Sequence, residues 1–288
     1  MRTGSSFAVA LTLGLAACGG GQPEAPSPAV TTLGYSMPAA TPVTYTSVDT
    51  ARVNIEVQPG MPMEQTMGQH STVRLAFAPL VGTAGNLAVT ATYVDFNAFV
   101  ESSMMGRQDV GDDALQGDFT LSLTPEGKVE QTGGPELPEE VEQLMMGQNM
   151  FADFFLRLPN RIVTPGESWT DTLRIETNED GNHSLNETII VSTLRGDTTV
   201  AGRTLWVIEA NKSASLLVEG NMQGMEMRNE LSGTVNEVSL WDPARRLLVS
   251  SRSSGTMTGS VSMPSAGMND IPISVSNVRS VTLVESAN

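Results

Sequence analysis

Residues 119–129 read FTLSLTPEGKV and contain the pattern that most clearly indicates the fold class. Phe119, Leu121 and Leu123 alternate with Thr and Ser, which is the two-residue period of a strand with one buried face. The next four residues are Thr-Pro-Glu-Gly, a combination typical of a tight turn. Val129 then begins a return strand. The stretch therefore predicts an antiparallel β-hairpin.

The same two-residue period recurs on both sides of this hairpin. Apolar residues stand two apart at positions 53, 55 and 57, 73, 75 and 77, 87, 89 and 91, 173 and 175, 205 and 207, 238 and 240, 247 and 249, 273 and 275, and 281 and 283. Between Ala91 and Val94 the apolar phase shifts, which predicts either a β-bulge or a strand buried on both faces. We expect a mainly β (α+β) fold, with a large curved antiparallel sheet or two packed β-halves.

One segment, residues 136–159, departs from this period. Pro138 and two glutamates stand near its start, and apolar residues follow at helical spacing at 141, 144, 145, 151, 154, 155 and 158. The pattern predicts one central helical segment that covers the concave face of the sheet. It separates an N-terminal β-region at 43–135 from a C-terminal β-region at 160–288.

The start of the chain has the features of a secretory signal. Arg2 precedes an apolar run over 7–15, and Leu15-Ala16-Ala17-Cys18 follows. This motif resembles the lipobox of bacterial lipoproteins, which implies a signal peptide at 1–17 and acylation, palmitate included, of Cys18. Gly19 follows the cysteine, and in that family this implies an outer-membrane anchor facing the periplasm. Residues 18–42 are rich in Gly, Pro, Ala, Ser and Thr, so we expect a flexible tether there.

A second motif lies directly after the predicted helical segment. Residues 163–169 read VTPGESW, and Trp169 is expected to start a strand. Together with the preceding strands and helix, this motif resembles a family of uncharacterised bacterial lipoproteins. The resemblance implies the architecture and carries no agreed activity.

Charge and motif content argue against several classes of function. The formal charge is −16, and Lys128 and Lys212 are the only lysines, which disfavours nucleic acid as a partner. The chain has no serine-hydrolase elbow, phosphate-binding loop, dinucleotide fingerprint or zinc-protease motif. Its two histidines, His70 and His183, fall at a strand start and in a polar turn. We therefore expect no enzyme activity and no cofactor.

Methionine is unusually frequent, with 16 residues in the chain. Met61, Met63, Met67 and His70 lie within ten residues, and thioether ligands select Cu(I). Methionine also fills irregular cores and lines adaptable apolar surfaces, and we favour that interpretation.

Our leading hypothesis is an envelope lipoprotein with a non-enzymatic binding or scaffold role for an apolar ligand or another envelope protein. Its membrane contact is the anchor at Cys18. The candidate ligand contacts are Met145, Phe151 and Phe155, on the underside of the predicted helical segment. The alternative is a periplasmic copper-binding lipoprotein that uses the methionine-rich stretch.

Overall fold

Most of the described residues lie in strands of one antiparallel sheet. The computed structural model describes residues 32–58, 61–103, 106–111, 115–136, 151–179, 181–222 and 225–284. In these ranges the sheet has twelve strands: β2 (Val43–Gln58), β3 (Met61–Pro79), β4 (Leu87–Ser102), β5 (Gly106–Val110), β6 (Asp118–Leu123), β7 (Val129–Gly133), β9 (Ser168–Glu179), β10 (Asn182–Val200), β11 (Arg203–Met222), β12 (Met225–Asp242), β13 (Leu247–Met263) and β14 (Met268–Val284). β1 (Thr32–Leu33) and β8 (Arg161–Ile162) form a separate pair, and η2 (Pro264–Ala266) is a short 3-10 turn.

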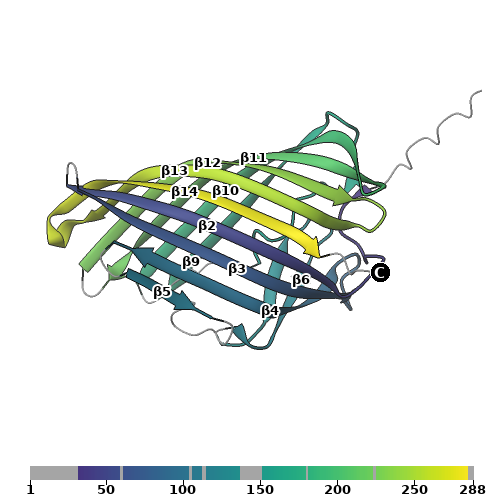
Figure 1. The fold of residues 1–288 in the computed structure, drawn as a ribbon, viewed down its shortest axis with the longest axis horizontal. Helices are drawn as coiled ribbons and strands as arrows, with labels where there is room; N and C mark the ends of the chain where they lie inside the picture. The colour runs from purple at the N-terminus through teal and green to yellow at the C-terminus, as the bar shows by residue number, and fades with distance from the viewer. Residues whose placement is uncertain are drawn as a thin grey trace, which may run out of the picture. The chain divides into compact units, whose positions relative to one another are not determined.

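The strand order joins the two halves of the chain into one sheet. The order is β7-β6-β4-β3-β2-β14-β13-β12-β11-β10-β9, and β5 pairs with β4 (Figure 1). The join is the antiparallel pair of β2 and β14, which extends from Ile55 opposite Ile273 to Thr44 opposite Val284. The predicted large antiparallel sheet is therefore confirmed, in the form of one sheet and not of two packed halves.

The sheet curls strongly, so that strands from both halves surround one interior. In Figure 1, β2, β3 and β4 lie in front and β9 and β10 pass behind them. Glycines allow part of this bending, because a Cβ at Gly255 would lie 2.5 Å from the Val235 side chain and 2.8 Å from the Thr234 carbonyl oxygen on β12. Two strands can approach this closely only where a side chain is missing.

A β-bulge in β4 explains the phase shift in the sequence. The register with β3 moves between Thr72 and Val73, which pair with Asp95 and Tyr93, so Val94 has no opposite residue. Val94 is 62% exposed, whereas Phe96, two residues on, is buried. Of the two predicted explanations, the bulge is the correct one.

The hairpin predicted at residues 119–129 is also confirmed. β6 and β7 pair through Leu123 opposite Val129, and the amide of Gly127 donates to the Thr124 carbonyl over 2.9 Å. Gly127 has a φ of 82°, and a Cβ there would collide with the carbonyl of Leu156. Glycine is therefore required both by the turn and by the segment packed against it.

One end of the curled sheet is closed by an aromatic core. Buried aromatic residues of the sheet and of the segments beside it meet there edge to face, and they are Tyr35, Tyr45, Phe119, Phe151, Phe154, Phe155 and Trp241. The segment 151–158 fills this end from within. We call this end the closed end.

The predicted helical segment is the main error in the fold class. Residues 137–150 lie outside the described residues, and 151–159 form turns and irregular backbone. The amide of Leu158 donates to the Glu126 carbonyl over 2.9 Å, and that of Leu156 to the Tyr35 hydroxyl over 2.9 Å, so neither follows a helical ladder. The described ranges contain no α-helix, and hence none long and apolar enough to span a bilayer. Consecutive turns can bury residues at the same spacing as a helix, so the α+β class is wrong and the described chain is nearly all β.

Ordered structure begins before the predicted end of the tether. We expected a flexible segment up to Pro42, but β1 starts at Thr32, and Leu33 and Tyr35 are buried in the closed end. Two isolated apolar residues in a Gly- and Pro-rich stretch leave its average composition unchanged, although each occupies a specific place in the core. Cys18 and the predicted signal lie outside the described residues.

Candidate functional site

Inward side chains change character along β2 and β14. On β2 they run, from the closed end outward, Val43, Tyr45, Ser47, Asp49, Ala51, Val53 and Ile55. On β14 the corresponding order is Leu283, Val281, Arg279, Asn277, Val275 and Ile273. The interior thus passes from an apolar core through a polar zone to a second apolar zone. We call the charged residues of the middle zone the charged belt: Asp49, Asp153, Lys212, Glu237 and Arg279.

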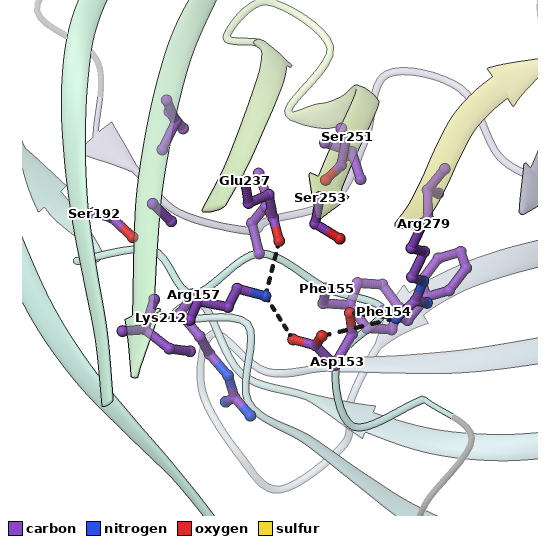
Figure 2. Close-up of a pocket in the computed structure, with 16 residues that line it drawn as sticks. Asp153, Phe154, Phe155, Arg157, Ser192, Lys212, Glu237, Ser251, Ser253 and Arg279 are labelled. Carbon is purple, nitrogen blue, oxygen red and sulfur yellow. Dashed lines mark hydrogen bonds and ion pairs between the residues drawn. The ribbon is translucent and has the colours of Figure 1, made fainter. Parts of the chain in front are cut away.

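Lys212 is the centre of the charged belt. Its side chain is buried on β11, and its Nζ lies 2.8 Å from Glu237 Oε2 and 3.0 Å from Asp153 Oδ1 (Figure 2). Glu237 is buried on β12, whereas Asp153 comes from the segment that fills the closed end. The lysine therefore ties that segment to the wall of the sheet through a charge-assisted hydrogen bond.

Arg279 holds the same segment from the opposite wall. Its Nη1 lies 3.8 Å from Asp153 Oδ2 and donates to the Asp153 backbone oxygen over 3.3 Å. On the neighbouring strand β2, Asp49 stands directly opposite Arg279 in the register. Asp153 therefore lies between two cations, Lys212 on β11 and Arg279 on β14. Asp49 lies opposite Arg279 on the neighbouring strand.

The ionisation of the belt follows from these contacts. Burial alone would lower the pKa of Lys212, but the carboxylates of Asp153 and Glu237 outweigh it and raise that pKa above the ordinary value. Burial would raise the pKa of Asp153, and Lys212 and Arg279 reverse this, so its pKa is lowered. For Asp49, burial is the larger effect and raises its pKa despite Arg279. Lys212 and Asp153 are therefore a stable ion pair at neutral pH.

A cavity of about 410 Å³ lies beside the belt. Its lining comes from nine strands and from the segment 151–158, and includes Asp49, Asp153, Lys212 and Arg279 together with Ala51, Met67, Leu173, Ile175, Ala214 and Val235. Asp153 is 50% exposed although protein surrounds it, because its side chain faces this space. A second pocket of about 30 Å³, large enough for a water molecule, lies between the belt and Phe154 and Phe155 (Figure 2).

The predicted aromatic ligand contacts lie in the core and not in the large cavity. Phe151 is fully buried among Tyr93, Phe119 and Phe154, and Phe155 is 6% exposed beside Tyr35. Phe155 lines only the small pocket, and Met145 lies outside the described residues. The neighbours of these phenylalanines, Ala152 and Asp153, are the residues that line the cavity.

The residues predicted as a copper site are not brought together. Met63 and Met67 are four residues apart on one face of β3, whereas His70 is on the other face and its Nδ1 lies 3.0 Å from Asp95 Oδ2. Met61 begins the same strand. One ion therefore cannot bind Met67 and His70 together. No group of three or more His, Cys, Asp or Glu side chains suited to a metal occurs among the described residues.

The sequence reasoning missed the charged belt. One signal was available: Ile208, Ala210, Lys212, Ala214 and Leu216 continue a single apolar phase, and a lysine in such a phase must be buried with a partner. Its partners, Glu237 and Asp153, could not be found from that stretch, because they lie 25 and 59 positions away in the chain.

The sequence matches no protein-family model and no curated protein. Among solved structures it is similar to a "putative exported protein with YmcC-like fold" from Bacteroides fragilis NCTC 9343. The identity is 8% and the TM-score 0.24, over 89% of this chain and 100% of that chain. Values this low support no argument about fold or function. The resemblance of the body to a lipoprotein family therefore stays a prediction.

Proposed function

We propose that this protein is a lipid-anchored, non-enzymatic binding protein of the cell envelope, and that it holds a small ligand with an apolar part in the cavity beside the charged belt. The observation that carries this proposal is the cavity itself. Its volume of about 410 Å³ falls within the roughly 300–1,000 Å³ usual for ligand sites. Its lining combines apolar side chains with a few charged and amide groups, as in other small-molecule sites.

The ionisation of Lys212 in the charged belt supports binding and not catalysis. A lysine that acts as a base or nucleophile needs a lowered pKa. The pKa of Lys212 is raised instead, because two carboxylates lie within 3.0 Å of its Nζ. Lys212 therefore positions the segment that carries Asp153 and shapes the inner wall of the cavity.

Filling the cavity should abolish ligand uptake. We expect wild-type protein to take up N-phenyl-1-naphthylamine, an uncharged fluorescent probe, with saturable enhancement of its emission. Ala214 lines the cavity and Ser213, its neighbour on β11, is exposed on the outer face of the sheet. Ala214→Phe should weaken probe binding at least about ten-fold, and Ser213→Phe should leave it unchanged.

Fluorescence titration measures both affinities, and thermal unfolding shows whether each variant is folded. If Ala214→Phe does not fold, Ala51→Leu on the opposite wall replaces it, with Thr50→Leu on the outer face of β2 as its control. The proposal fails if wild-type protein shows no saturable uptake, or if the inward and outward substitutions act alike.

The predicted anchor has its own test. A lipoprotein held by two or more acyl chains stays on the membrane, whereas a chain without them does not. Cys18→Ser should therefore move the protein from the membrane fraction to the soluble fraction after a high-salt wash. Retention of the Cys18→Ser protein on membranes would show that something other than acylation of Cys18 holds it there.

A further inference from the structure

A second apolar zone continues the cavity toward the outer ends of the strands. Its members are half-buried or buried inward residues of β2, β11, β12, β13 and β14: Val53, Ile55, Leu216, Met227, Leu231, Met257, Val261, Ile273 and Val275. We call this set the apolar strip. Within it, Leu231, Val261 and Ile273 are buried and the others are partly exposed.

The strip and the cavity are one surface, because the same faces of the strands form both. On β2, Ala51 lines the cavity, and Val53 and Ile55 follow two and four residues later. On β11, Ala214 in the cavity is followed by Leu216 in the strip. Residues two apart share a face at about 3.3 Å per residue, so the strip extends the cavity by roughly 13 Å along β2.

At the inner end of this surface, each cation of the charged belt already faces two carboxylates, and the belt of three carboxylates and two cations has a formal charge of −1. Lys212 lies between Asp153 and Glu237, and Arg279 lies between Asp153 and Asp49. An anionic group entering the cavity would approach the carboxylates of Asp49 and Asp153. A cationic group would approach Lys212 and Arg279. Asn186, Thr188, Ser253 and Asn277 supply uncharged hydrogen-bonding groups in the same lining.

We propose that the ligand is a single-chain amphiphile, with an uncharged polar group at the charged belt and its acyl chain along the apolar strip. This inference rests on the proposed binding function and names its ligand class. The cavity volume of about 410 Å³ lies near the lower limit of the usual range, which favours one chain over two. The orientation follows from the order of the zones, since the polar zone lies deep and the apolar strip lies outside it.

The head-group preference can be measured by displacement of N-phenyl-1-naphthylamine from the Cys18→Ser protein. Three competitors of equal chain length are compared at pH 8: a monoacylglycerol, a fatty acid and an alkylamine. We expect the monoacylglycerol to displace the probe at a concentration at least about ten-fold lower than either charged compound. Asp49→Asn removes one negative charge from the charged belt. The affinity of the fatty acid, relative to that of the alkylamine, should therefore rise at least about five-fold.

The position of the chain is tested by paired substitutions on β13 and β14. Met257 and Val275 belong to the strip and face each other across the two strands, whereas Thr258 and Val278 are exposed on the outer face. Met257→Gln should weaken monoacylglycerol binding at least about ten-fold, and Thr258→Gln should not change it. Val275→Thr, against Val278→Thr, repeats the comparison with a milder change in case Met257→Gln does not fold.

The outcomes separate this inference from the proposed function. Three results would overturn the amphiphile assignment. The three competitors could displace the probe equally well, or a soluble oligosaccharide could displace it better than any of them. The third is that Met257→Gln and Val275→Thr bind the monoacylglycerol as wild type does. The binding function then still stands, provided that Ala214→Phe abolishes probe uptake. If the probe does not bind wild-type protein at all, the proposed function fails, and this inference fails with it.

Discussion

Phe151→Ala is expected to lower the free energy of unfolding by about 3–5 kcal/mol, because it leaves a cavity in a fully buried aromatic cluster. The ring of Phe151 lies 5.6 Å from that of Phe119, 6.0 Å from that of Tyr93 and 6.3 Å from that of Phe154, measured between centroids. Urea unfolding followed by tryptophan emission measures the change.

A phenylalanine on the outer face is the matched control for this substitution. Phe99 on β4 is half-buried there, with the guanidinium carbon of Arg107 3.8 Å from its ring centroid. Phe99→Ala should cost less than half as much as Phe151→Ala. Equal losses, or a loss below about 1 kcal/mol at Phe151, would contradict the assignment of 151–158 to the core.

Lys212→Met should destabilise the protein by a similar amount, about 3–5 kcal/mol, because it removes the cation from a buried ion pair. Glu237 is 8% exposed, and without the ammonium 2.8 Å away it is a buried carboxylate whose counter-charge is gone. The cost is smaller for the Asp153 carboxylate, because it is half exposed to the cavity and Arg279 remains near it. Chemical denaturation at pH 7 measures the loss.

Two further variants identify the cause of that loss. Lys212→Met combined with Glu237→Leu removes both charges and should recover most of the stability, since an apolar pair of similar size often equals a buried ion pair. Arg195→Met removes the cation of an exposed pair, in which Nε lies 2.6 Å from Glu209 Oε2, and should cost less than about 1 kcal/mol. A double variant as unstable as Lys212→Met alone would show that lost packing, and not the stranded carboxylate, causes the effect.

The contrast between two apolar patterns shows how far sequence reasoning could reach. The period-two runs predicted strands correctly, and the phase shift after Ala91 indicated the bulge at Val94. The spacing of Phe151, Phe154 and Leu158 predicted a helix and was wrong in the described residues. A two-residue period maintained over a strand has one common explanation, whereas three or four apolar residues at intervals of three and four also suit turns enclosed by a sheet.

Less of the candidate site than of the fold could be predicted from the sequence. Phe151 and Phe155 were correctly singled out as inward residues, but their role as ligand contacts is not supported, because both are packed in the closed end. Met67 reaches the cavity wall without the other proposed copper ligands. Lys212 and Arg279 could have been suspected from their places in apolar phases, while Asp153 could not, because nothing local distinguishes it from other surface charges.

The local sequence was enough to predict that the chain forms antiparallel strands and which side chains share a face. Both properties depend on residues two apart and on turns of a few residues, so they can be read locally. Three features could be read only from the folded chain: β14 pairs with β2, the sheet curls far enough to enclose a cavity, and four elements bring Lys212, Glu237, Asp153 and Arg279 together. These depend on how bulges and glycines bend long strands and on which distant charges can pair once water is excluded, and no short stretch of the sequence contains that information.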